Sequence, residues 1–139
     1  TEMTTPAYSA DAEDEAVQAE LLTNLWRLFF AQRSMEAIIY WNVPDGYAHR
    51  AEPGDMTAGQ NIYYGGLLGF DLHEKPAWKA LDRLVNYEWH TETTAPVKNG
   101  TAEFRGFYGN YNVIVHAGGR QIPAKLRHTK GIMQHEIII

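Results

Sequence analysis

The stretch of residues 37–42, AIIYWN, decides the predicted fold. It is a continuous run of apolar, β-prone residues, which is typical of a strand buried on both faces in a parallel sheet. On its N-terminal side, residues 13–32 carry apolar side chains at helical spacing after Asp11, a residue suited to cap a helix. On its C-terminal side, residues 43–75 form a long irregular segment of the kind that is usually functional.

The order of predicted elements up to about residue 88 is strand end, loop, helix, strand, long loop and helix. Pro76 suits the first turn of the second helix, and Glu2 is placed as the last residue of the first strand. A βαβα order indicates the α/β class, with a parallel sheet and crossover helices. Both edges of a two-stranded sheet are open to pairing, so we expect further strands upstream of Thr1 or self-association of the chain.

The remainder of the chain differs in character. A polar, turn-rich linker, TETTAPVKNG, is followed by short β-prone runs that Gly-Asn, Gly-Gly and Lys-Gly pairs divide. We expect three to five antiparallel strands in a small β-module that is too small to be very stable alone. The predicted domains are therefore residues 1–90 and residues 91–139.

Composition narrows the classes of function. The 139 residues carry a net charge of −5, which argues against electrostatic binding to nucleic acid or to anionic lipid. The absence of cysteine excludes thiol nucleophiles and thiolate metal sites. The six histidines form no recognisable ligand set, so no zinc site is expected.

Several short motifs, in order, resemble the C-terminal third of glycoside hydrolase family 10, the β-1,4-xylanases built on a (β/α)8 barrel. The resemblance covers about residues 1–88. The matching residues are Thr1-Glu2, Tyr40-Trp41-Asn42, Asp45, Ala48-His49-Arg50, Leu67-Leu68, Phe70-Asp71 and Lys75-Pro76-Ala77. In two places the chain departs from the family pattern: His49 stands in place of Trp, and Asn42 in place of Gly.

The resemblance implies that residues 1–90 are the last two βα units of a TIM barrel and that residues 91–139 are a small antiparallel β appendage. It implies a retaining endo-β-1,4-xylanase acting on xylan or a related plant polysaccharide, with secretion or a periplasmic location favoured. Glu2 would be the nucleophile, and Trp41, Asn42, Tyr47 and His49 would bind the sugar. The general acid/base Glu would lie upstream, so the chain alone would be inactive, because this mechanism needs two carboxyl groups. The implied mechanism requires no metal and no cofactor.

Other interpretations remain open at this stage. A glutamate in a loop is usually a solvated charge, and a tryptophan such as Trp41 in an apolar strand is often a core residue. The runner-up function is a non-catalytic carbohydrate-binding or assembly module, in which the β-module displays the aromatic residues Phe104, Phe107, Tyr108 and Tyr111. A third hypothesis is a small α/β ligand-binding domain that completes its sheet by oligomerising.

Overall fold

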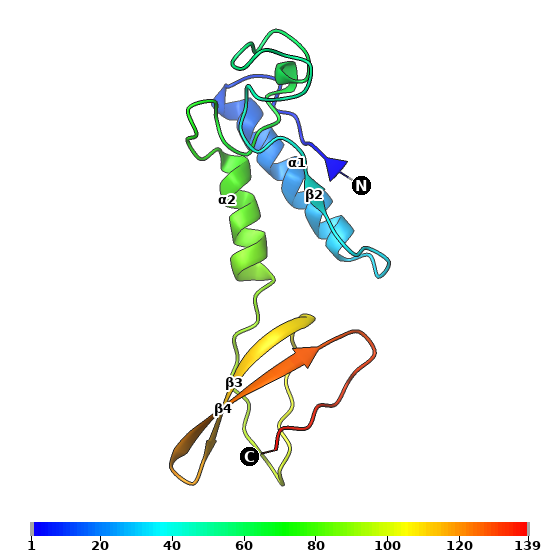
Figure 1. The fold of residues 1–139 in the computed structure, drawn as a ribbon, viewed down its shortest axis with the longest axis vertical. Coiled ribbons are helices and arrows are strands. Elements are labelled where there is room, and N and C mark those ends of the chain that lie inside the picture. Colours follow the sequence, from blue (N-terminus) through cyan, green and yellow to red (C-terminus); the bar gives the residue numbers. More distant parts are fainter. Residues whose placement is uncertain (1, 139) are drawn as a thin grey trace. The chain divides into compact units, whose positions relative to one another are not determined.

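The computed structural model describes residues 2–138, and the chain divides after Glu88 into two compact units. We call residues up to 88 unit 1 and residues from 89 onward unit 2, and each is described by itself (Figure 1). The predicted match at Thr1 lies outside the described residues. Within residues 2–138, no helix has both the length and the apolar composition that a membrane span requires.

Unit 1 contains a two-stranded parallel sheet and two α-helices. Strand β1 (Glu2–Met3) pairs with strand β2 (Ile39–Tyr40), with Glu2 opposite Ile39 and Met3 opposite Tyr40. Helix α1 (Ala12–Phe30) connects the two strands, and helix α2 (Pro76–Arg83) follows the long segment after β2. A short 3-10 helix η1 (Asn61–Tyr63) lies within that segment, and a π-helical turn η2 (Leu84–Glu88) continues α2.

The apolar core of unit 1 lies where α1 and α2 pack against each other (Figure 1). Leu22 and Trp26 of α1 are buried, as are Ala77 of α2 and Leu84 of η2. The predicted apolar stripe of α1 is wider than this core, because Leu28 is 55% exposed. The helical period was therefore a correct guide to the helix, but only part of its apolar face is covered within unit 1.

A buried polar cluster fastens the long segment 43–75 to α1. The Lys75 ammonium lies 2.8 Å from the Asp45 carboxylate and donates to the Tyr64 carbonyl at 2.9 Å. The Gly66 backbone N–H donates to the other Asp45 oxygen at 2.7 Å. Gln18 of α1 donates from its amide to three backbone carbonyls, including that of Gly66 at 3.1 Å. Because buried polar groups need partners, these bonds determine the path of a segment that has little regular structure.

Unit 2 contains one long β-hairpin. Strand β3 (Gly109–Ala117) pairs antiparallel with strand β4 (Arg120–His128), and Ala117 lies opposite Arg120. Gly118 and Gly119 form the connecting turn with φ of +55° and +75°, the backbone region that a two-residue hairpin turn requires. The turn at these glycines is confirmed, but the described part of unit 2 has two paired strands rather than three to five.

The predicted barrel fragment is wrong. The described residues form two α-helices and two small two-stranded sheets, with no barrel. The run at 37–42 supplies only a two-residue strand, because Asn42 leaves the extended conformation with φ of +68°. It is not buried on both faces either, since Ile39 is 50% exposed and Trp41 is 45% exposed.

Candidate functional site

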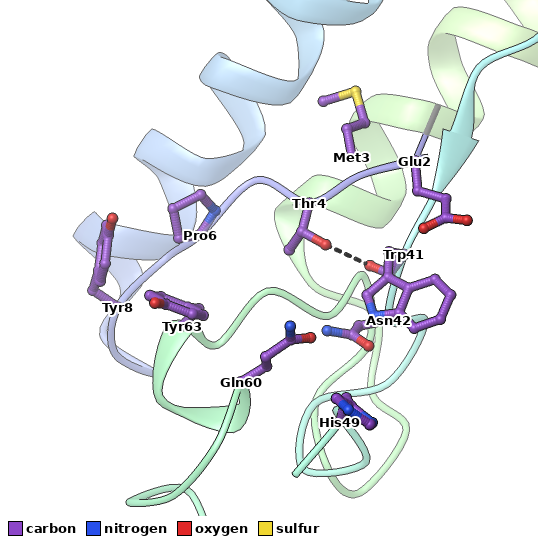
Figure 2. Close-up of a pocket in the computed structure, with 10 residues that line it drawn as sticks. All are labelled: Glu2, Met3, Thr4, Pro6, Tyr8, Trp41, Asn42, His49, Gln60 and Tyr63. Atoms are coloured by element: carbon purple, nitrogen blue, oxygen red, sulfur yellow. Dashed lines mark hydrogen bonds between the residues drawn. The ribbon is translucent and has the colours of Figure 1, made fainter. Parts of the chain in front are cut away.

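A pocket of about 490 Å³ opens in unit 1 beside the carboxyl ends of the two parallel strands. Figure 2 shows side chains from β1 and the loop after it, from the end of β2 and from η1 surrounding this space. The lining residues are Glu2, Met3, Thr4, Pro6, Tyr8, Trp41, Asn42, His49, Gln60 and Tyr63. In parallel sheets the carboxyl ends of the strands are the usual place for ligands.

Strand pairing positions the first wall of the pocket. The Trp41 backbone N–H donates to the Met3 carbonyl at 2.9 Å, and the Thr4 hydroxyl donates to the Trp41 carbonyl at 3.0 Å. The first bond extends the backbone pairing past Tyr40, and the second ties the Thr4 side chain to the same residue. In Figure 2 the Glu2 carboxylate and the Trp41 indole lie next to each other on this wall. Both side chains are exposed, so the indole offers an accessible apolar face and the carboxylate an accessible acceptor.

Two amide side chains meet in the middle of the pocket. Asn42 adopts a left-handed backbone conformation with φ of +68°, which asparagine tolerates better than most residues. Its side chain and that of Gln60 point toward one another in Figure 2. Each amide offers both donors and an acceptor, so this part of the pocket suits a polar, hydrogen-bonding ligand.

Two tyrosines form the far wall. The rings of Tyr8 and Tyr63 lie edge to face, with centroids 6.0 Å apart. The backbone N–H groups of Ala7 and Tyr8 both donate to the Tyr63 carbonyl at 3.0 Å, which ties the loop after β1 to η1. Tyr8 has a φ of +71°. Backbone strain of this kind tends to gather at binding sites, and here two of the lining residues, Tyr8 and Asn42, show it.

Buried Asn61 fixes the loop that carries His49 and Gln60, two of the residues that line the pocket. Its side-chain oxygen accepts from the Ala48 N–H at 2.8 Å, and its amide donates to the Asp55 carbonyl at 2.9 Å. The Gln60 N–H in turn donates to the His49 carbonyl at 3.1 Å. These bonds bring His49 and Gln60 together, and the same two residues also line a second hollow of about 500 Å³.

Tyr40 of β2 ties the strand to two loops behind the pocket, at Thr5 and at Gly65. Its hydroxyl donates to the Gly65 carbonyl at 2.8 Å and accepts from the Thr5 N–H at 3.2 Å. Burial raises the pKa of the Tyr40 hydroxyl above its ordinary value of 10.0, because the phenolate would be poorly solvated there. The hydroxyl therefore stays protonated at neutral pH and works as a structural crosslink.

The structure brings four of the five predicted site residues to one pocket: Glu2, Trp41, Asn42 and His49. Tyr47 is not among the lining residues, because its ring stacks on Phe70 at a centroid distance of 5.3 Å.

Sequence reasoning missed Tyr8, Gln60 and Tyr63. These residues lie in loops and a short 3-10 helix, where no periodic pattern marks the side that faces a ligand.

The pocket is equipped for binding more plainly than for acid/base chemistry. Glu2 is the single carboxylate among the lining residues, and His49 is the single imidazole. Among residues 2–138 no group of three or more His, Asp or Glu side chains is arranged to hold a metal ion. Aromatic faces, amides and one carboxylate together make a recognition surface.

No protein-family model matches the chain. It is similar to the anti-sigma-I factor RsgI6 of Acetivibrio thermocellus, with 28% identity over 114 residues. The aligned part is 81% of this chain but 13% of that relative, so the chain spans only a small part of the relative's length.

These findings correct the predicted function. The relative carries the name of a regulatory protein and not of a glycoside hydrolase, and the described residues show no barrel. We therefore withdraw the assignment to glycoside hydrolase family 10, the xylanase activity and the classification as an enzyme. The polysaccharide partner predicted with them is withdrawn as well, because the name of the relative refers to a sigma factor and not to a polysaccharide.

Proposed function

We propose that this chain is a ligand-recognition module of a regulatory protein that acts on a sigma factor. The observation that carries this proposal is the similarity to an anti-sigma factor along 81% of the chain. The sigma factor is the partner of the complete protein, because the similar region is only 13% of that relative.

The chemistry of the pocket supports a recognition role. Trp41 and Tyr63 supply apolar ring faces, while Asn42 and Gln60 supply hydrogen-bond donors and acceptors. Glu2 adds an exposed carboxylate. A free carboxylate repels anions and attracts cations. The expected ligand is therefore a small polar molecule that is uncharged or cationic and has one apolar face.

Ligand binding can be tested on the 139-residue chain with a panel of small neutral amides, alcohols and amines, together with matched carboxylates. Binding is measured by isothermal titration calorimetry and by tryptophan fluorescence. We expect neutral or cationic members to bind saturably and to lose binding in Trp41→Phe. The matched control is Trp78→Phe, because Trp78 lies on α2 and outside the pocket. Preferential binding of the carboxylates, or equal binding by both variants, would contradict the proposal.

The regulatory part of the proposal needs the complete protein. Its affinity for the sigma factor is measured with and without a ligand that binds the pocket. We expect the ligand to change this affinity in the wild type, and Trp41→Phe to abolish the change while leaving the ligand-free affinity intact. A ligand-free affinity that falls in Trp41→Phe would instead place the pocket in the sigma-factor interface and refute a sensing role.

A further inference from the structure

Unit 2 brings together two histidines that lie seven residues apart in sequence. His128 is the last residue of β4, and His135 lies in the segment that follows. Nδ1 of His128 and Nε2 of His135 are 3.2 Å apart, and the two rings meet edge to face with centroids 5.5 Å apart. The ring of Tyr108 packs beside His128 at a centroid distance of 5.0 Å.

We propose that His128 and His135 form a binding site for a zinc ion, which joins the C-terminal segment 129–138 to β4. Two imidazole nitrogens that bind one tetrahedral zinc at about 2.0–2.1 Å lie about 3.3 Å from each other. The observed separation of 3.2 Å between the two nitrogens is already at this spacing. To bind one ion, both nitrogens must turn their lone pairs toward it, and the His135 ring is exposed rather than packed in a core.

The protons on the two imidazole rings can be rearranged so that zinc replaces the hydrogen bond between them. In the hydrogen-bonded pair one of the two facing nitrogens carries a proton and donates the hydrogen bond, and the other nitrogen accepts that bond with its lone pair. When zinc enters, that proton is lost from the facing nitrogen and the ring's other nitrogen is protonated instead. Each neutral ring then binds through one nitrogen and keeps its single proton on the other, so no net proton is released.

The surroundings leave room for the rest of the coordination shell. His135 is exposed and His128 is half-buried, so water reaches the positions that the two rings leave open. Arg127 is the nearest cation in sequence to His128, but successive side chains of a strand point to opposite faces. No third His, Asp or Glu among the described residues completes the set. The site is therefore an open one with two protein ligands and modest affinity.

Zinc binding at this site has a structural consequence. Within residues 129–138, the Ile132 N–H donates to the Thr129 carbonyl at 3.1 Å and closes a turn. An ion shared by His128 and His135 closes this segment onto the end of β4. Since a ligand that binds only the ordered form stabilises that form, zinc should protect the C-terminal segment.

The test uses ZnCl2 titrated into the full 139-residue chain, followed by calorimetry. We expect one zinc per chain, with binding weakened at least about tenfold by either His135→Gln or His128→Gln, because each variant leaves one imidazole without the second, intramolecular ligand. His116→Gln is the matched control, since His116 lies on β3 near the hairpin turn, opposite Gln121. MgCl2 should not bind, because magnesium prefers oxygen ligands.

A second measurement separates a site from a loss of fold. Digestion by a carboxypeptidase should be slowed by zinc in the wild type and in His116→Gln, but not in His135→Gln. His135 follows the last described strand, so its replacement should leave the circular dichroism of the hairpin unchanged. The inference is overturned if zinc does not bind saturably, or if His135→Gln and His116→Gln bind it equally.

Discussion

Replacing Lys75 by Met should destabilise unit 1 strongly. The side chains of Lys75 and Asp45 are 0% and 8% exposed, and their charged atoms are 2.8 Å apart. Removing one member of a buried ion pair costs about 3–5 kcal/mol, because the other charge stays buried without its partner. Asp45 keeps the hydrogen bond from the Gly66 N–H, so we expect the lower end, about 3 kcal/mol. The free energy of unfolding of a small domain is only about 5–15 kcal/mol.

The measurement is urea denaturation of the full chain followed by tryptophan fluorescence, with the free-energy change taken from the midpoint shift at constant slope. Lys79→Met is the matched control, because Lys79 is exposed on α2, the helix that Lys75 precedes. It should change stability by less than about 0.5 kcal/mol. Adding Asp45→Asn to Lys75→Met should restore part of the loss, since it removes the buried charge but keeps an acceptor. Equal midpoints for Lys75→Met and Lys79→Met would refute the reasoning.

Three further predictions concern stability. Leu22→Ala should cost about 2–5 kcal/mol, because Leu22 is fully buried, whereas Leu28→Ala, at a side chain that is 55% exposed, should cost much less; thermal denaturation compares the two. Because burial holds the pKa of Tyr40 above 10.0 in the folded chain, the folded state retains this proton more tightly than the unfolded state. Its stabilising contribution is complete below about pH 10 and is lost as the pH rises through the folded pKa, so the melting temperature should fall more steeply above pH 10 in the wild type than in Tyr40→Phe. Gly59→Ala should destabilise the chain more than Gly100→Ala. Both glycines have positive φ, but a Cβ at Gly59 would overlap the Arg50 backbone carbonyl, whereas a Cβ at Gly100 would meet open space. Equal melting temperatures for the two variants would contradict this prediction.

Local signals in the sequence were good guides to local structure. Helix α1 runs from Ala12 to Phe30, close to the predicted residues 13–32, with Asp11 at its N-cap position. Pro76 is the first residue of α2, as its restricted φ suggested. The glycine pair at 118–119 forms the hairpin turn. Each of these features depends on a few neighbouring residues, so a short window of sequence contains the information.

The same kind of reasoning failed for burial and for the fold. A continuous apolar run does not show how many strands lie beside it, and residues 37–42 proved to have a single partner strand of two residues. The order of weak motifs suggested a barrel, but the described residues do not form one. Residue propensity indicates which backbone conformation a segment favours. Packing against neighbouring elements determines how much of that segment is buried.

Short windows of sequence therefore predicted where the helices begin and where the hairpin turns, and the family resemblance suggested Glu2, Trp41, Asn42, Tyr47 and His49 as candidates for one site. The three-dimensional arrangement was needed to show that Glu2, Trp41, Asn42 and His49 share a pocket. It was also needed to show that Tyr47 stacks on Phe70 and that His128 contacts His135. The physical reason is the range of the interactions. Helix periods and turns arise between residues close in sequence, whereas the pocket depends on bonds such as that from the Thr4 hydroxyl to the Trp41 carbonyl, 37 residues apart, which no local pattern predicts.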